Sequence, residues 1–170
     1  MNINQLKYKL AEKLPGIDSH IKMAPEHRAE ELFKINPDDL NPRLSAVLII
    51  LFHEDGKLKI VFIRRSEYVG IHSGQIAFPG GRYEESDKEL KTTALREVEE
   101  EIGIKTETVD ILGHLTDLYI PPSNFMVRAF VGYVNEKPVF NINEREVQEV
   151  LVLNYEHFKR PDVIKVREFK

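Results

Sequence analysis

The sequence predicts one mixed α/β domain, in which a β-sheet is packed against helices. Several apolar segments have the length and residue types of strands, and the most helical segment, 88–102, lies between them. The chain has 170 residues, which is the length of one ordinary domain. Hydrophobic residues make up 42% and charged residues 31%, as in globular proteins that bury a core.

The charge balance and the absence of cysteine exclude several classes of function. Lys and Arg number 24 against 28 Asp and Glu, which gives a formal net charge of -4 and no basic block for nucleic acid or an anionic membrane. With no Cys, the chain has no disulfide, thiolate zinc site or cysteine nucleophile. No signal-peptide pattern and no run of about 18 apolar residues is present, so we expect a cytoplasmic protein that is not inserted in a membrane.

The first part of the chain is expected to be an extension that packs on the domain. Leu6, Leu10 and Leu14 recur at helical spacing and predict an amphipathic helix over 2–14, ending before Pro15. Residues 18–43 are polar and interrupted by prolines, with a short helix expected over 26–34. We therefore divide the chain into an N-terminal helical extension, 1–43, and a domain, 44–170.

The domain begins with a predicted hairpin and continues through further strands. The apolar run 45–53 and the strand 58–63 flank Asp55-Gly56, which suits a tight hairpin turn, and the first strand is expected to be central in the sheet. A glycine-rich stretch, 70–81, precedes the helix over 88–102, which ends at Gly103. The remaining predicted elements are strands at 109–119, 126–134, 147–153 and 163–169, and a short helix at 155–159.

The helix over 88–102 carries an acidic face. Glu97, Glu100 and Glu101 fall at roughly 0°, 300° and 40° around its axis, so the three carboxylates share one side. A solvated acidic face is the simplest interpretation. Like charges at this spacing are unfavourable unless a cation lies among them, however, and Mg²⁺ or Mn²⁺ prefers oxygen ligands. The glycines of Phe78-Pro79-Gly80-Gly81, just before this helix, would let the backbone approach such an ion or a phosphate closely.

Two segments resemble motifs of one enzyme family. Gly81, Asp87 and the run 96–104 (REVEEEIGI) resemble the Nudix box: 96–104 matches every specified position, whereas Asp87 replaces a Glu and is followed by one extra residue. Upstream, the residues that resemble the signature of the coenzyme A pyrophosphatase branch are Arg65-Ser66, His72, Gly74, Gln75 and Phe78 to Gly81. Gly70 departs from that signature, which has an Arg there.

The resemblance implies a fold, a reaction and a set of site residues. The fold is a Nudix-like α/β/α sandwich with a mixed β-sheet, and the reaction is Mg²⁺- or Mn²⁺-dependent hydrolysis of a pyrophosphate bond. Metal ligands are expected to be the Gly80 carbonyl and the side chains of Glu97, Glu100 and Glu101. The catalytic residues are expected to be Arg96, Glu97 and Glu100, with Arg96 orienting the carboxylates. For the base that activates water, Glu97, Glu100, Glu146 and Glu149 remain open.

Substrate contacts are expected around this box. The candidates are Arg64, Arg65, His72, Phe78 and Phe125. The alternatives are that the arginines are solvated at a strand end, that the histidine makes a loop hydrogen bond and that Phe125 packs in the core.

The preferred function is a coenzyme A diphosphatase that releases 3′,5′-ADP and a 4′-phosphopantetheine product. The alternatives are a Nudix hydrolase of ADP-ribose, a dinucleotide or a modified nucleotide, and a nucleotide sensor without activity. The expected partner is a small nucleotide, with neither nucleic acid nor membrane. Domains of this kind usually continue into a C-terminal helix, which this sequence lacks after 163–170. We therefore expect a partner subunit, as in a homodimer, or the N-terminal helix to cover one sheet face, unless the chain is a shortened form.

Overall fold

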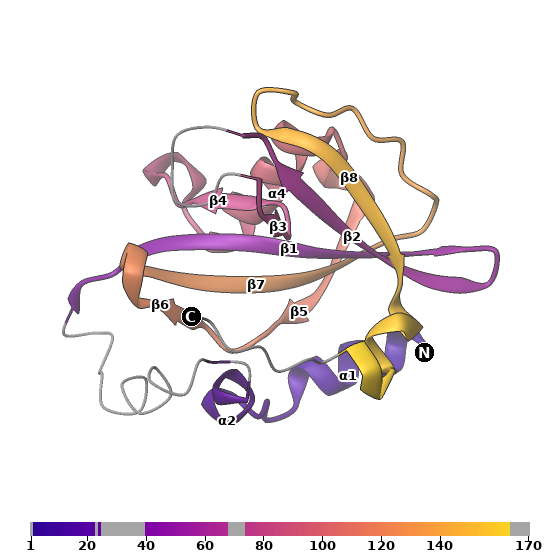
Figure 1. Cartoon of the computed structure of the whole chain (residues 1–170), viewed down its shortest axis with the longest axis horizontal. Coiled ribbons are helices and arrows are strands. Elements are labelled where there is room, and N and C mark those ends of the chain that lie inside the picture. The colour runs from indigo at the N-terminus through magenta and orange to yellow at the C-terminus, as the bar shows by residue number, and fades with distance from the viewer. Residues whose placement is uncertain (1, 23, 25–39, 68–73, 164–170) are drawn as a thin grey trace.

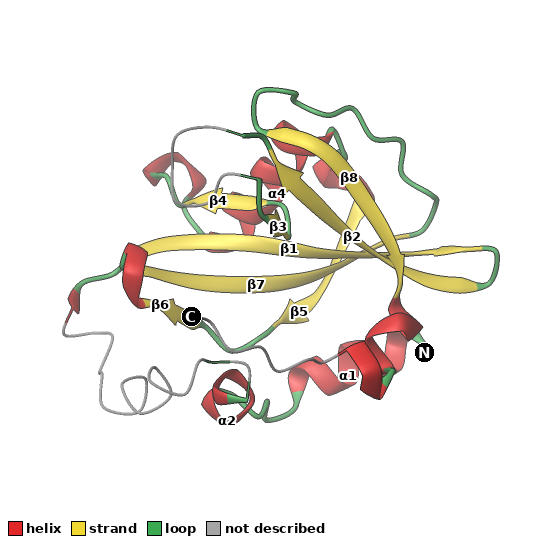
Figure 2. Ribbon diagram, in the orientation of Figure 1, coloured by secondary structure: helices red, strands yellow, loops and turns green. Residues whose placement is uncertain are grey.

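The computed structural model describes residues 2–22, 24, 40–67 and 74–163. It is built on a mixed sheet with α-helices against it (Figures 1 and 2). The strands are β1 (Arg43–Glu54), β2 (Lys57–Arg65), β3 (Ile76–Ala77), β4 (Gly80–Arg82), β5 (Val109–His114), β6 (Leu118–Ile120), β7 (Phe125–Val134) and β8 (Val147–Asn154). The α-helices are α1 (Ile3–Ala11), α2 (Ile17–Ile21) and α4 (Leu90–Ile102), and short 3₁₀ turns are η2 (Glu85–Asp87), η3 (Thr106–Thr108), η4 (Pro121–Ser123), η5 (Tyr155–Lys159) and η6 (Pro161–Val163).

Strand β1 lies at the centre of the sheet, as its apolar sequence predicts. It pairs antiparallel with β2 and β4 and parallel with β7. Strands β5 and β6 continue the sheet beyond β7, and β8 pairs antiparallel with β2 (Figure 1). The β1–β2 turn places Asp55 at φ 51° and Gly56 at φ 71°, the left-handed conformation that this dipeptide favours in hairpins. The predicted mixed α/β sheet is confirmed.

The two faces of β1 are buried against different helices. Ala46, Leu48, Ile50 and Phe52 face one core cluster, which includes Ala94, Val98 and Ile102 of α4. Leu51 belongs to a second cluster, against which Ile3, Leu6 and Leu10 of α1 are packed. The alternation follows from the two-residue period of a strand. The N-terminal helix is one of the two elements expected to cover a sheet face, and it packs against this second face.

The structure differs from the sequence prediction in local detail. The single strand expected over 109–119 is divided into β5 and β6, which both pair with β7. His114 pairs with Phe130 and Leu118 with Val127, so this side has one extra residue between the two pairs and the strand is interrupted there. The glycine-rich stretch contains β3 and β4, and α2 follows α1; none of these was predicted. Helix α4 begins at Leu90, since η2 and the positive φ of Lys88 precede it. The expected helix over 26–34, residues 164–169 of the expected last strand, Gly70 and His72 lie outside the described residues.

Candidate metal and active site

The glycine pair at β4 brings backbone directly against α4. The Gly80 N–H donates a 2.9 Å hydrogen bond to Oε2 of Glu101. A Cβ at Gly80 would collide with the carbonyl oxygen of Ala46, and one at Gly81 would collide with the carboxylate of Glu97. Gly80 therefore requires glycine, because its neighbours there are backbone atoms and its φ is +154°. A side chain at Gly81 would instead push the Glu97 carboxylate out of its place.

Three carboxylates meet beside the glycine pair. Ligand oxygens of Glu97, Glu101 and Glu146 all lie within 4.8 Å of one another. Two of these residues are one turn apart on α4, and the third comes from the turn before β8. Glu101 is 1% exposed, whereas Glu146 is exposed. Such clustering of like charge is unfavourable unless protons or cations occupy the group.

Burial shifts the protonation of these carboxylates. It raises the pKa of Glu101 from 4.5 to about 7, although the Gly80 N–H and Arg65 act in the opposite direction. Burial also raises the pKa of Glu97, against the lowering effect of Arg96. A divalent cation would displace the proton and satisfy the charge, and carboxylate oxygen is the donor that Mg²⁺ and Mn²⁺ prefer. The residues present therefore fit a hard divalent cation.

Arg96 holds the acidic residues in place. Its Nε lies 2.8 Å from Oδ1 of Asp87, and its Nη1 lies 2.9 Å from both Oε1 of Glu97 and Oε2 of Glu100. Its Nη2 donates to Oδ2 of Asp87 at 3.1 Å and to the Arg82 carbonyl at 3.2 Å. The guanidinium thus offsets negative charge beside the cluster, and its catalytic role stays a prediction.

Asp87, in the η2 turn that precedes α4, anchors Arg96. This carboxylate is 4% exposed and also accepts hydrogen bonds from the Thr93 hydroxyl at 2.8 Å and the Glu84 N–H at 3.0 Å. Its hydrogen bonds with Arg96 hold the pKa of Asp87 well below its usual range. Asp87, which departs from the box pattern, is thus a buried anchor for Arg96. In the structure its side chain also forms a capping box with Glu84.

The structure does not bring all predicted site residues into the cluster. Glu100 is half-exposed and pairs with Arg96 outside the three-carboxylate group, so its metal-ligand role stays a prediction. Glu149 lies on β8 and forms a 2.6 Å ion pair with Nε of Arg64. Arg65 faces the cluster, with Nη1 3.5 Å from Oε1 of Glu101.

Both aromatic residues predicted to contact substrate, Phe78 and Phe125, pack against other side chains. Phe78 stacks on Phe62 with ring centroids 4.7 Å apart, and the guanidinium of Arg43 lies 4.2 Å from the centroid of Phe125. These contacts favour packing for Phe78 and a cation–π pair for Phe125. Their substrate roles stay predictions.

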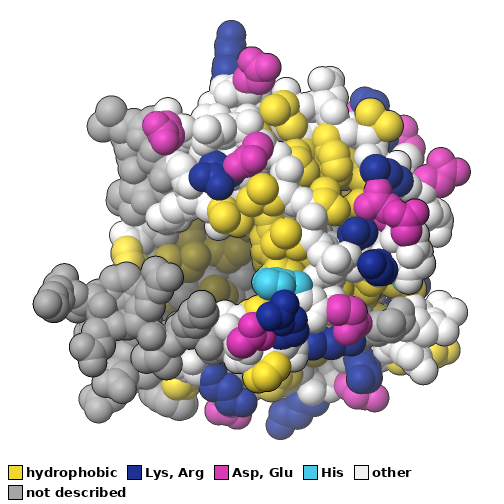
Figure 3. Space-filling view, turned by 45° about the vertical axis from the view of Figure 1, so that its right-hand side comes forward, with side chains coloured by type: hydrophobic (Ala, Val, Ile, Leu, Met, Phe, Trp, Pro, Cys, Tyr) yellow, Lys and Arg dark blue, Asp and Glu magenta, His cyan; other side chains and the backbone are white. Residues whose placement is uncertain are grey.

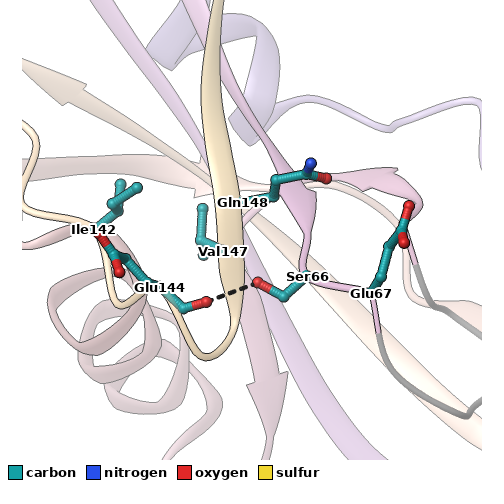
Figure 4. A pocket seen from close by; sticks show the side chains of 6 residues that line it. All are labelled: Ser66, Glu67, Ile142, Glu144, Val147 and Gln148. Atoms are coloured by element: carbon teal, nitrogen blue, oxygen red, sulfur yellow. Dashed lines mark hydrogen bonds between the residues drawn. The ribbon is translucent and has the colours of Figure 1, made fainter.

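A cavity of about 340 Å³ adjoins the turn that carries Glu146 (Figure 4). It is lined by Ser66, Glu67, Ile142, Glu144, Val147 and Gln148. A larger hollow of about 680 Å³ lies at the C-terminal end of α4 between residues 103–108 and 134–139, and contains none of the clustered carboxylates. The lining of the smaller cavity contains none of these carboxylates either, but it includes Glu144 and Val147, which lie on the two sides of Glu146 in the chain.

On the face in Figure 3, acidic and basic side chains are interspersed. No helix within the described residues has the length and apolar character needed to cross a membrane.

The sheet, the glycine pair and the glutamates of α4 define a member of the Nudix class, and comparison with known proteins agrees. The NUDIX domain family matches residues 42–169, so the chain belongs to the Nudix family. It is 36% identical over 136 residues to "Nudix hydrolase 22, chloroplastic" of Arabidopsis thaliana, covering 78% of this chain and 45% of that protein. It is also 32% identical over 118 residues to "Peroxisomal coenzyme A diphosphatase NUDT7" of Mus musculus, covering 69% of this chain and 50% of that protein. The chain thus spans about half the length of these curated relatives.

A solved structure shows the same fold at lower sequence identity. The C. elegans Ap4A hydrolase, in a binary complex, aligns with a TM-score of 0.58 at 18% identity. The alignment covers 71% of this chain and 89% of that structure. The Nudix-like sandwich is confirmed by this likeness.

The raised pKa of Glu101 predicts a pH-dependent stability that Glu101→Gln removes. Without metal, the folded state binds this proton more tightly than the unfolded state between pH 4.5 and about 7, so the stabilisation present at low pH is lost as pH rises through that window. Glutamine has no proton to lose and can still accept from Gly80. In EDTA at pH 8 we expect Glu101→Gln to be more stable than wild type by on the order of 2 kcal/mol, and nearly equal at pH 4.5. Urea unfolding at both pH values measures this; a difference independent of pH would contradict it.

Proposed function

We propose that this chain hydrolyses the pyrophosphate bond of a nucleoside diphosphate derivative with Mg²⁺ or Mn²⁺. The convergence of Glu97, Glu101 and Glu146 beside Gly80 and Gly81 is the observation that carries the proposal. An anionic substrate would be repelled by these carboxylates alone, so the cation is essential to binding as well as to reaction.

In the proposed mechanism the carboxylates of the cluster bind the cation, and one of them also accepts a proton. Glu97, Glu101 and Glu146 would hold the cation, together with the Gly80 carbonyl predicted from the sequence. When bound, the cation supplies charge neutralisation at the phosphates and acidifies a water molecule. Arg96 keeps Glu97 oriented, and a glutamate of the cluster accepts the proton of the attacking water. Of the two later glutamates, we propose Glu146 for this task, since Glu149 is paired with Arg64 outside the cluster.

Coenzyme A or one of its derivatives is the substrate that we propose. The supporting observations are the upstream signature and the similarity to the mouse coenzyme A diphosphatase. The products would be 3′,5′-ADP and a 4′-phosphopantetheine compound. We retain the cytoplasm as the proposed compartment and a homodimer as the proposed assembly, the latter measurable by light scattering during size-exclusion chromatography.

A substrate panel tests this function. Purified protein with Mg²⁺ or Mn²⁺ is incubated with coenzyme A, ADP-ribose, NADH, a diadenosine polyphosphate and nucleoside triphosphates, and the products are identified by mass. Preferential release of 3′,5′-ADP from coenzyme A supports the proposal, whereas preference for another compound keeps the chemistry and refutes the substrate. If the folded protein binds a nucleotide but turns over none, it is a sensor and the proposed activity is wrong.

A further inference from the structure

The turn that carries Glu146 is fastened to the end of α4. The Asn141 N–H donates to the Ile102 carbonyl at 2.9 Å, and the Asn143 N–H donates to the Glu101 carbonyl at 2.9 Å. These carbonyls belong to the last turn of the helix and have no partner within it. The segment 141–146 therefore caps the helix that carries the other two carboxylates.

Ser66, at the end of β2, fastens the same turn from its other side. The Ser66 hydroxyl donates to the Glu144 carbonyl at 2.9 Å, as Figure 4 shows, and the Ser66 N–H donates to the Glu146 carbonyl at 2.9 Å. The side-chain amide of Asn143 completes the turn by donating to Oε1 of Glu146 at 3.2 Å. Ser66 thus ties the turn to the sheet while the asparagine backbone ties it to the helix.

These tethers act against electrostatic repulsion. Glu146 is exposed, and its carboxylate lies close to those of Glu97 and Glu101. Repulsion between these like charges favours movement of the turn away from the helix. The contacts of Ser66 with the turn oppose that movement, because opening the turn breaks them. Removing the hydroxyl leaves the N–H bond in place, so it weakens the hold on the turn without removing a core side chain.

We propose that Ser66 is a positioning residue that holds the 143–146 turn so that Glu146 completes the metal-binding cluster. This rests on the proposed function, since it assumes that the cluster binds Mg²⁺ or Mn²⁺. Ser66 acts through the turn and touches neither metal nor substrate in this role.

Substitutions of Ser66 test the role by metal affinity. We expect Ser66→Ala to weaken Mn²⁺ binding about fivefold, the size of one lost hydrogen bond, with the midpoint of thermal unfolding nearly unchanged. Ser66→Thr keeps the hydroxyl, and because Ser66 lines the cavity we expect the added methyl group to be accommodated and wild-type affinity to be retained. Gln148→Ala, at the same cavity, is the matched control that should leave affinity unchanged. Calorimetric titration of the full chain with Mn²⁺ measures the affinity. In the activity assay, Ser66→Ala is expected to lower kcat by a larger factor than it changes KM.

A double-mutant cycle with Glu146→Gln separates this role from a general structural one. Because Ser66 acts through Glu146, Ser66→Ala should cause little further loss of Mn²⁺ affinity in the Glu146→Gln protein. An equal loss in both backgrounds, or wild-type affinity in Ser66→Ala, would overturn the proposal. If the wild-type chain binds no Mn²⁺, both the proposed function and this inference fail. If the wild-type chain binds Mn²⁺ and Ser66→Ala binds it equally well, this inference fails while the proposed function stands.

Discussion

Replacing Glu97 with glutamine should reduce the proposed metal-dependent hydrolysis by about 10³-fold, within the range attributed to a positioned carboxylate. Glutamine has nearly the same shape, so it fits beside Gly81 and can accept the 2.9 Å hydrogen bond from Arg96. What it lacks is the negative charge that attracts a cation or accepts a proton. Thermal unfolding should therefore change little while turnover, measured by product release under saturating Mg²⁺, is nearly lost.

Glu99→Gln is the matched control for this prediction. Glu99 lies on the same helix but pairs with Lys105 and accepts from the Thr106 N–H, away from the cluster. The same chemical change should leave turnover near the wild-type value. Turnover of Glu97→Gln within threefold or so of wild type would refute our assignment of the site, because general acid–base and metal-ligand losses are much larger.

Helix periodicity predicts only part of this site. It places Glu97 and Glu101 on one face, and the structure confirms their proximity. It also places Glu100 there, but that side chain turns to Arg96 and stays half-exposed, because a salt bridge one helical turn away is available to it. Helix periodicity gives the side of the helix on which Glu100 lies. It does not say whether the side chain points to Arg96 or to the cluster, because that depends on the surrounding charges.

The contribution of Glu146 depends on tertiary structure. From the sequence, Glu146 and Glu149 are equivalent candidates for the base that activates water. Glu146 comes just before a predicted strand and Glu149 lies within it. They separate because the 143–146 turn caps α4, whereas β8 directs Glu149 to Arg64. Neither contact has a local sequence signal, so only the folded arrangement distinguishes the two residues.

The strands show the same division between local and tertiary information. Strands β1 and β2 are predicted well, since apolar runs flank a turn dipeptide with a strong conformational preference. Strands β3 and β4 are two and three residues long and exist through their pairing with β2 and β1. The glycines at β4 signal close approach, but which backbone they approach becomes clear only in the fold.

Asp87→Ala should cause the largest loss of stability among the substitutions considered, about 3 kcal/mol. It removes the buried acceptor of Arg96, Thr93 and the Glu84 N–H at once, leaving a partly buried guanidinium without its closest carboxylate. Since the pKa of Asp87 lies well below its usual 3.8, its contribution is fully present above about pH 4 and is lost as pH falls further. The stability difference from wild type, measured by urea unfolding, should accordingly be largest near neutral pH and shrink in acid.

Asp117→Ala distinguishes this buried anchor from an ordinary ion pair. Asp117 also binds an arginine through two contacts, each 2.7 Å, but the side chains of Asp117 and Arg128 are 30% and 35% exposed. Solvent screens such a pair, so its loss should cost at most about 1 kcal/mol. Equal losses of unfolding free energy in the two variants would mean that burial does not make the Asp87 pair more stabilising than an exposed one. A larger loss in Asp87→Ala, accompanied by weaker Mn²⁺ binding, would show that the anchor of Arg96 also supports the carboxylates that Arg96 orients.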